Sequence, residues 1–220
     1  MLNRLKSAAA VFLVLFSLIT LSSPKLDMDK LVAFTREKYD EDAVKRIIAW
    51  RAMIDNKQQL PEQEKLKLVN QFFNYFEFVD DIRLWGKEDY WATPLEFIGI
   101  RGGDCEDFAV AKYFTLLELG IPMEKLRLGY VKSLTLNQFH MVLAYYPTKT
   151  SMPLILDNID GEIKPAYKRK DLVLIVSFNG QKLWLNKQKG KGKTASSSAR
   201  MADWDNLSNR YSMEQFMSEE

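Results

Sequence analysis

The length, composition and charge of this chain bound its class before any motif is considered. Its 220 residues suffice for one domain with appendages, and 47% hydrophobic residues with 13 Phe, 9 Tyr and 5 Trp can supply a sizeable core. The 31 Lys and Arg residues nearly balance the 29 Asp and Glu residues, which leaves a formal charge of +2. This balance gives no reason to expect nucleic acid as a partner.

The first 23 residues are typical of an export signal. Arg4 and Lys6 precede residues 8–21, an uncharged and mostly apolar run. A run of this length suits the hydrophobic region of a signal peptide and is too short to cross a bilayer comfortably. Cleavage after Ser22 is expected, with an uncleaved anchor as the alternative. In either case the rest of the chain is exported, and it has no stable membrane insertion if the signal is removed.

Residues 24–186 are predicted to form one domain that begins with helices. The acidic run 40–42 suits a helix start, and apolar residues follow it at helical spacing. Pro61 suits the first position of a second helix, whose apolar residues recur every three or four positions. A loop-rich stretch over residues 80–103 is expected next.

A third helix is expected from Asp104 to Leu119. Asp104 is a good N-cap, Asp107 follows it at capping-box spacing, and Gly120 ends the helix. Beyond it the hydrophobic period changes to that of strands, which are expected near residues 126–131, 140–146, 153–159, 172–178 and 182–185. Asn179-Gly180 is a strong hairpin signal between the last two. Helices followed by antiparallel strands indicate an α+β domain.

The C-terminal residues 187–220 are predicted to be an appendage. Residues 187–202 are rich in Lys, Gly and Ser and are expected to be a flexible basic linker. Residues 204–220 either form a short docking helix or are disordered.

The only cysteine, the only histidine and a following aspartate are candidates for a catalytic triad. Cys105 falls in the first turn of the predicted third helix, where the helix dipole favours a thiolate. His140 opens one predicted strand and Asp157 closes another, so adjacent antiparallel strands would place them side by side. Each residue alone is more typical of a structural role, but together they suit acyl transfer through a thiol.

An oxyanion hole needs two hydrogen-bond donors. The backbone N–H of Cys105 is the natural first donor. The indole N–H of Trp91 or the side-chain amide of Gln138 is the candidate for the second.

Acidic residues around the thiol are unexpected at a thiolate site. Asp104, Glu106 and Asp107 would raise the pKa of Cys105 and oppose its ionisation. Clustered carboxylates suit a hard cation, and outside the cytosol Ca²⁺ is the natural one. The alternative is that these acids only cap a helix.

The sequence resembles the bacterial transglutaminase-like cysteine proteinases, whose characterised members are periplasmic LapG-like proteases. The resemblance is carried by Gly103-Asp104-Cys105-Glu106-Asp107-Phe108-Ala109 and extends over about residues 40–186. The matching stretches are residues 85–86, 89–97, 103–109, 112–116, 124–128, 130–132, 136–138, 140–147, 153–158, 177–179 and 184–185. Phe139 stands where a smaller residue is expected, and the segment after Lys187 has no match.

The resemblance implies a papain/transglutaminase-like α+β fold, in which N-terminal helices and the helix that carries the cysteine pack on an antiparallel sheet. It implies a Cys105-His140-Asp157 triad, and Ca²⁺ bound by Asp104 and Glu106. The implied activity is cleavage of the N-terminal region of a large surface adhesin in the periplasm, which disperses biofilm. The implied inhibitor is the periplasmic domain of an inner-membrane cyclic-di-GMP receptor.

Two other functions are compatible with the same residues. A transglutaminase-type acyltransferase would use the same triad and thioester to cross-link proteins. A calcium-responsive binding module would retain the triad without catalysis.

Overall fold

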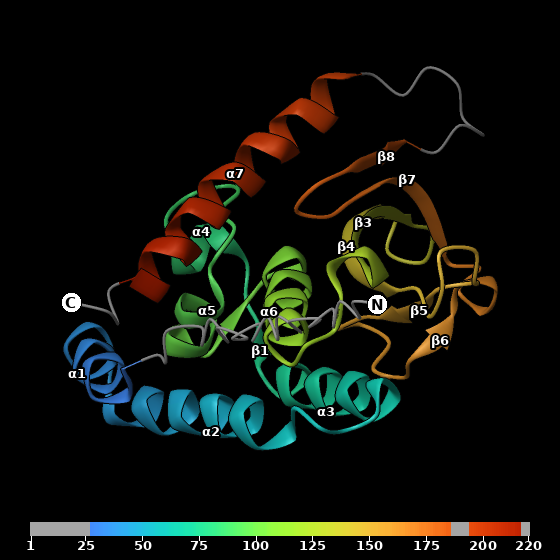
Figure 1. Cartoon of the computed structure of the whole chain (residues 1–220). Coiled ribbons are helices and arrows are strands. Elements are labelled where there is room, and N and C mark those ends of the chain that lie inside the picture. The colour runs from blue at the N-terminus through green and yellow to red at the C-terminus, as the bar shows by residue number, and fades with distance from the viewer. Residues whose placement is uncertain (1–26, 186–193, 217–220) are drawn as a thin grey trace, which may run out of the picture.

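The computed structural model describes residues 27–185 and 194–216. Helices form one side of the molecule and an antiparallel sheet the other, with α6 (Cys105–Glu118) between them (Figure 1). The predicted signal of residues 1–23 lies outside the described residues. No helix within the described part of the chain is long and apolar enough to span a membrane.

The N-terminal helices are α1 (Met28–Lys38), α2 (Glu41–Lys57) and α3 (Glu62–Asn74). The starts of α2 and α3 agree with the sequence prediction to within one residue, whereas α1 was not predicted as a separate helix. Asp40 caps α2, because its Oδ1 accepts a hydrogen bond from Ala43 N at 2.6 Å. Pro61 occupies the N-cap of α3, one residue before the predicted position.

The stretch 80–103 is more regular than the loop-rich segment expected from the sequence. It contains α4 (Asp81–Leu84) and α5 (Pro94–Ile100), and β1 (Glu77–Phe78) pairs in parallel with β2 (Gly102–Gly103). Helix α5 has a full capping box, since Thr93 Oγ1 accepts from Glu96 N and Glu96 Oε2 accepts from Thr93 N. Pro94 at the first helical position completes a signal that the sequence carries.

Helix α6 is the centre of the core. Eleven consecutive residues of it, Glu106 to Leu116, are buried. Phe97 of α5 lies between Phe73 of α3 and Phe108 of α6, with ring centroids 5.9 and 4.9 Å away. Full burial of each such ring contributes roughly 1.5–3 kcal/mol, so these rings fix α6 against the other helices.

Among the described residues, six strands form one antiparallel sheet in the order β6-β5-β4-β3-β7-β8. Leu128, Met141 and Leu143 belong to the main core that includes α6, whereas Val142 and Ile155 belong to a second, smaller apolar cluster. A 3₁₀ turn, η1 (Met123–Lys125), enters the sheet, and another, η2 (Ala166–Lys168), precedes β7. The strands are β3 (Leu126–Ser133), β4 (Gln138–Tyr145), β5 (Leu154–Leu156), β6 (Lys164–Pro165), β7 (Leu172–Phe178) and β8 (Leu183–Leu185).

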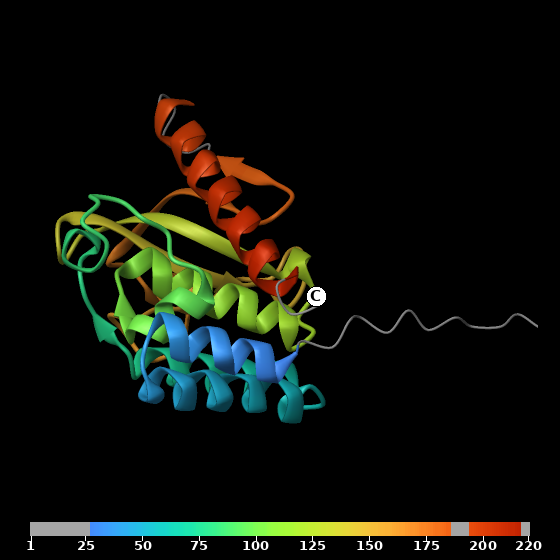
Figure 2. The same cartoon turned by 90° about the vertical axis from the view of Figure 1, so that its left-hand side faces the viewer.

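The C-terminal appendage contains a long helix, α7 (Thr194–Phe216), which contacts α6 through Trp204 and α5 through Arg210 (Figures 1 and 2). The prediction of a flexible linker over 187–202 is therefore wrong for 194–202, while 187–193 lie outside the described residues. Trp204 anchors the helix, because its ring stacks on Phe114 and meets Tyr113 and Phe178 edge-on at centroid distances of 5.4–5.7 Å. Of the two alternatives for residues 204–220, the docking helix is the one observed up to Phe216.

The anchoring by Trp204 can be tested through stability. We expect Trp204→Ala to lower the free energy of unfolding by about 3–5 kcal/mol, because it removes a buried ring from between three aromatic neighbours. Urea unfolding followed by circular dichroism would measure this. The exposed Asn209→Ala on the same helix is the control and should change stability by less than about 0.5 kcal/mol. Equal stability of Trp204→Ala and the control would contradict docking of α7.

Candidate active site

Cys105 is the first residue of α6, as the sequence predicts. The backbone just before α6 requires glycine at position 103. A Cβ on Gly103 would lie 2.3 Å from Asp107 Oδ2 and 2.8 Å from the Phe97 ring. Asp107 in turn accepts hydrogen bonds from Asp104 N at 3.3 Å and Ala92 N at 2.7 Å. The cysteine is thus held at the helix N-terminus by close packing and by a buried carboxylate.

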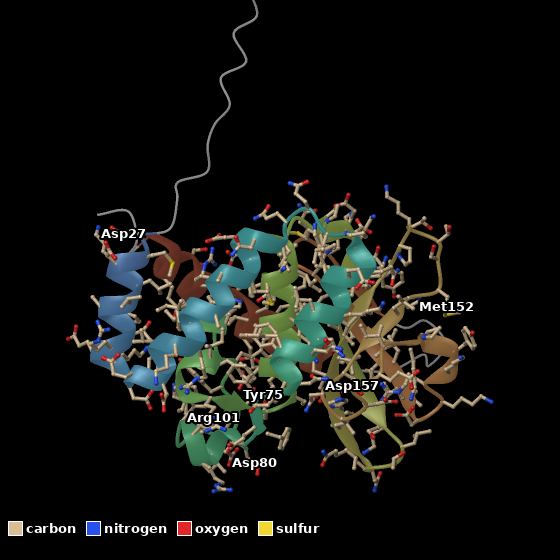
Figure 3. The ribbon with its side chains drawn as sticks, turned by 90° about the horizontal axis from the view of Figure 1, so that it is seen from below. Asp27, Tyr75, Asp80, Arg101, Met152 and Asp157 are labelled. Atoms are coloured by element: carbon tan, nitrogen blue, oxygen red, sulfur yellow. The ribbon has the colours of Figure 1, made fainter. Side chains whose placement is uncertain are left out.

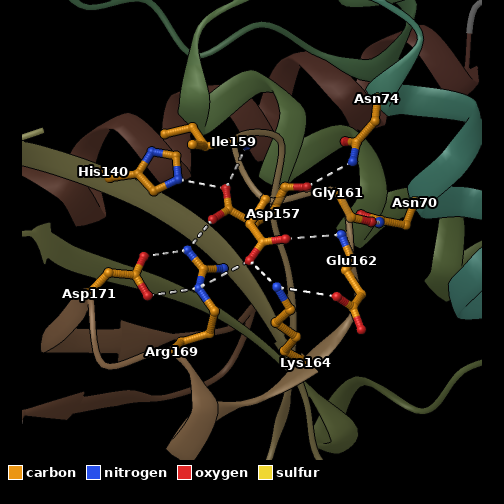
Figure 4. Close-up of polar contacts among 11 residues, drawn as sticks. Asn70, Asn74, His140, Asp157, Ile159, Gly161, Glu162, Lys164, Arg169 and Asp171 are labelled. Atoms are coloured by element: carbon orange, nitrogen blue, oxygen red, sulfur yellow. Dashed lines mark hydrogen bonds and ion pairs between the residues drawn. The ribbon is translucent and has the colours of Figure 1, made fainter. Parts of the chain in front are cut away.

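His140 and Asp157 form a buried hydrogen-bonded pair. The antiparallel pairing of β4 with β5 places Leu143 opposite Leu156, so His140 in β4 and Asp157 just after β5 lie on neighbouring strands. His140 Nε2 lies 2.7 Å from Asp157 Oδ1, and both side chains are at most 1% exposed (Figure 4). With its Nε2 proton directed to Asp157, the neutral ring keeps Nδ1 as the nitrogen that can accept a proton.

Asp157 is held on every side. Its Oδ1 also accepts from Ile159 N at 3.1 Å, and its backbone carbonyl accepts from Asn74 Nδ2 at 2.8 Å. The latter bond ties the end of β5 to the last residue of α3, and Figure 3 shows Asp157 near that end of the helix. The side-chain oxygen Oδ1 is therefore fixed by His140 and Ile159 N, and the backbone of Asp157 is fixed by Asn74.

The second oxygen of Asp157 meets a residue that the sequence did not single out. Arg169 Nη2 lies 2.7 Å from Asp157 Oδ2. Burial alone would raise the pKa of Asp157, but the hydrogen bonds from His140, Ile159 and Arg169 outweigh it and lower the pKa to about 2. Arg169 stands between two lysines in a basic run, so no sequence pattern distinguishes it from solvent-exposed charge.

The thiol of Cys105 is directed to an acid in this structure. Its Sγ lies 3.0 Å from Glu106 Oε2, and the backbone N–H of Met141 in β4 also bonds to the sulfur. Within the described residues no hydrogen bond joins Cys105 to His140. Burial, followed by the charges of Glu106 and Asp104, raises the pKa of Cys105 well above its usual value. The expected opposition of these acids to a thiolate is therefore present.

A cluster of five carboxylates includes two, Asp104 and Glu106, that lie beside the thiol. Asp104 and Glu106 were predicted as metal ligands, and the structure adds Asp81, Asp89 and Asp107. Ligand atoms lie within 4.8 Å of one another in each of three groups: Asp104, Cys105 and Glu106; Asp81, Asp104 and Asp107; and Asp81, Asp89 and Glu106.

Two members of this cluster have oxygens without a hydrogen-bond partner. Asp81 Oδ1 and Asp104 Oδ1 are buried and unbonded. Burial and the neighbouring carboxylates raise the pKa of Asp104 to about 10, and that of Asp81 to about 6 despite a hydrogen bond from Tyr90 N. Orphaned carboxylate oxygens at mutual metal-ligand distance fit a hard cation. Asp107 differs, since backbone N–H groups occupy both its oxygens.

The two candidate oxyanion donors, Trp91 and Gln138, differ in solvent exposure. Trp91 is buried, its ring stacks on Phe178 at 6.0 Å, and the next residue, Ala92, bonds to the first turn of α6. Gln138 is exposed and lies two residues before His140 in β4. Both stay predictions.

Phe139 forms an exposed aromatic surface beside His140. It is 55% exposed, and its ring stacks on Tyr130 at a centroid distance of 5.1 Å. Lys132 Nζ lies 5.2 Å from the Phe139 ring. The unexpected size of this residue therefore adds apolar surface on β4, and the His140–Asp157 pair is present beside it.

The lowered pKa of Asp157 predicts a pH-dependent contribution to stability. A carboxylate whose folded pKa is below its unfolded value stabilises the fold above the unfolded value, and this stabilisation is lost as pH falls through the folded value. For Asp157 this window runs from 3.8 down to about 2.

We expect the difference in unfolding free energy between wild type and Asp157→Asn to shrink by about 2 kcal/mol as the pH falls from about 4 to about 2. Urea titrations at several pH values would measure it. Asp55→Asn, at an exposed carboxylate, controls for general loss of charge. A difference that stays constant across this range would contradict the assigned environment of Asp157.

The chain is similar to known cysteine proteinases over most of its length. The sequence profile described as bacterial transglutaminase-like cysteine proteinase BTLCP matches residues 32–190. A structure of Legionella pneumophila LapG is 43% identical, covers 86% of this chain and 99% of its own, and has a TM-score of 0.71. An EGTA-treated form of that protein is 42% identical, with coverages of 86% and 100% and a TM-score of 0.72.

A calcium-bound form of Legionella pneumophila LapG is 43% identical, with coverages of 84% and 99% and a TM-score of 0.71. No curated relative matches the chain. These similarities confirm the predicted α+β, transglutaminase-like fold. The chain belongs to the bacterial transglutaminase-like cysteine proteinases and is a cysteine protease.

Proposed function

We propose that this protein is a calcium-dependent periplasmic endopeptidase that cleaves the N-terminal region of a large surface adhesin, releasing it and promoting biofilm dispersal. The observation that carries the proposal is the buried His140–Asp157 pair beside a helix that begins at the only cysteine. The 43% identity to LapG supports the substrate class. The export signal expected over residues 1–23 supports the compartment.

The proposed catalytic cycle uses Cys105 as the nucleophile and His140 as the general base and acid. The Cys105 thiol gives its proton to His140 Nδ1, and the sulfur attacks the carbonyl carbon of the scissile peptide. The oxyanion so formed accepts a hydrogen bond from the Cys105 backbone N–H at the start of α6. His140 then protonates the leaving amine as the C–N bond breaks, which leaves a thioester on Cys105.

Hydrolysis of the thioester restores the enzyme. His140, neutral again, takes a proton from a water molecule that attacks the thioester carbonyl, and then returns that proton to the departing Cys105 sulfur. Asp157 stays ionised throughout and orients the imidazole through Nε2. A transglutaminase-type reaction would differ only in using an amine in place of this water.

Calcium fits the acidic cluster. Asp104 and Glu106, with Asp81 and Asp89, would hold the ion, and the orphaned oxygens of Asp81 and Asp104 are suited to it. A bound divalent cation supplies positive charge that offsets the carboxylates and favours ionisation of the neighbouring thiol. LapG from Legionella pneumophila has a calcium-bound form, which supports the same ion here.

Regulation is proposed to follow from the family resemblance. The inhibitor would be the periplasmic domain of an inner-membrane cyclic-di-GMP receptor, which sequesters the protease. The exposed aromatic surface at Phe139, next to His140, is available for contact with a protein substrate or with such an inhibitor.

A cleavage assay tests the proposal. Residues 24–220 are incubated with an N-terminal adhesin fragment from the same organism, with calcium, with chelator, and as Cys105→Ala. We expect a discrete shortened product on a gel only with calcium and intact Cys105. Cross-linked product in place of shortened polypeptide would indicate acyl transfer, and cleavage that persists with chelator would exclude a calcium requirement.

The metal ligands can be tested by binding. We expect Asp104→Ala and Glu106→Ala to abolish calcium-dependent cleavage. In the Cys105→Ala background, Asp81→Asn and Asp89→Asn should each weaken calcium binding by about tenfold or more, because each removes a carboxylate from the cluster. Isothermal titration calorimetry would measure this. Glu88→Gln removes an exposed charge beside Asp89 and is the matched control, with little change expected.

A further inference from the structure

Arg169 is a buried cation bound to the aspartate of the triad. It is 5% exposed, and Nη2 lies 2.7 Å from Asp157 Oδ2. Asp157 is 1% exposed, and its other oxygen is occupied by His140 and by Ile159 N (Figure 4). The two oxygens of one carboxylate thus face different partners, His140 on one side and the guanidinium on the other.

The guanidinium of Arg169 is itself held in place. Asp171 binds it through two bonds, Nε to Oδ1 at 3.0 Å and Nη2 to Oδ2 at 2.8 Å. Asp160 Oδ2 lies 3.9 Å from Nε and is bonded to Lys164 at 2.7 Å. The orientation of Arg169 is therefore set by residues other than Asp157.

The backbone around Arg169 is tied at both ends. Arg169 N donates to Ala166 O at 3.0 Å, which closes the turn η2, and Leu172 N donates to Arg169 O at 3.2 Å, at the entry to β7. Both bonds lie in the segment that joins the β5–β6 ribbon to the central strands. A rigid turn of the sheet thus presents the guanidinium to the triad.

We propose that Arg169 is a positioning residue of the protease, which binds Asp157 Oδ2 so that Oδ1 stays directed at His140 Nε2 and the carboxylate stays ionised. The proposal rests on the triad assigned above. A carboxylate that lost this partner would be a buried charge with fewer hydrogen bonds, and its protonated form would be favoured. A protonated Asp157 is neutral and accepts a weaker hydrogen bond from His140 Nε2–H. The imidazole is then less firmly oriented.

Other charged groups near the pair do not replace Arg169. Lys112 of α6 is 1% exposed and interacts with Asp157, but burial lowers its pKa to about 7. Lys164 is bound to Asp160 and Glu162. Arg169 is therefore the permanently charged cation that contacts Asp157 among the described residues.

A spectroscopic test needs no substrate. His140 is the only histidine, so the low-field proton resonance of an Nε2–H bonded to a carboxylate can be assigned without ambiguity. In Cys105→Ala protein with calcium, we expect Arg169→Met to lose this resonance on acidification at a pH about one unit higher than the parent. Arg169→Lys should lie between the two. Lys168→Met, which removes an exposed neighbouring charge, should match the parent.

Kinetics give a second readout on the adhesin fragment. We expect Arg169→Met to lower kcat by about tenfold to hundredfold with KM changed by less than about twofold, and to move the acid limb of the pH profile upward. Recovery of most activity in Arg169→Lys would indicate that charge at this position is what matters.

A parent-like resonance and a parent-like kcat in Arg169→Met would overturn the proposal. If Arg169→Met does not fold, Arg169→Gln keeps a polar side chain with hydrogen-bond donors but removes the charge, and the same shift to higher pH is expected; no shift would overturn the proposal. If wild type fails to cleave any adhesin fragment, the substrate assignment is wrong, while the resonance still decides the role of Arg169 at the His140–Asp157 pair.

Discussion

The burial of α6 between two layers is the constraint on which the site depends. Helices α3 and α5 cover one side of it through Phe73 and Phe97, and β4 covers another through Met141 and Leu143. A helix packed in this way cannot shift without opening the core. Its N-terminus is therefore a fixed point, and Cys105, at the first position, is brought against β4 close to His140 by the packing itself, as the bond from Met141 N to its sulfur indicates.

The same burial creates the electrostatic difficulty of the site. A helix N-terminus favours an anion, but burial and the neighbouring acidic groups of Glu106 and Asp104 oppose ionisation of the thiol. In this low-dielectric position burial and the acidic neighbours outweigh the helix dipole, so the thiol stays protonated and bonds to Glu106. The opposite holds for Asp157, where burial is outweighed by specific partners and the acid stays ionised. The candidate site therefore contains acidic groups beside Cys105 that need a positive charge to offset them. It also contains Asp157, which is already paired with Arg169.

Sequence patterns predicted the features that depend on local order and missed those that depend on distant contacts. The N-terminus of α6, five of the six strands described in the main sheet and the placement of His140 and Asp157 on neighbouring strands follow from periodicity and capping signals, and the structure agrees. The two-residue strand β6 was not predicted. Arg169 was missed because its role exists only through contact with Asp157. Asp81 was missed because it joins Asp104 only when α4 folds back on α6. Helix α5 was a local error, since Thr93 and Glu96 carry a capping box that the sequence displays.

The C-terminal helix α7 contacts the segment that holds two acids of the candidate site, although the sequence suggested an appendage. Arg210 of α7 donates to the carbonyl of Trp91 and lies 2.9 Å from Tyr90 Oη. Two backbone N–H groups of the same short segment, residues 90–92, donate hydrogen bonds to acids of the cluster. Tyr90 N donates to Asp81 Oδ2 at 2.5 Å, and Ala92 N donates to Asp107 Oδ1 at 2.7 Å. Two of the clustered acids are thus held by a segment that α7 itself holds. Since buried like charges repel, a rigid backbone frame is what keeps the carboxylates within ligand distance of one another.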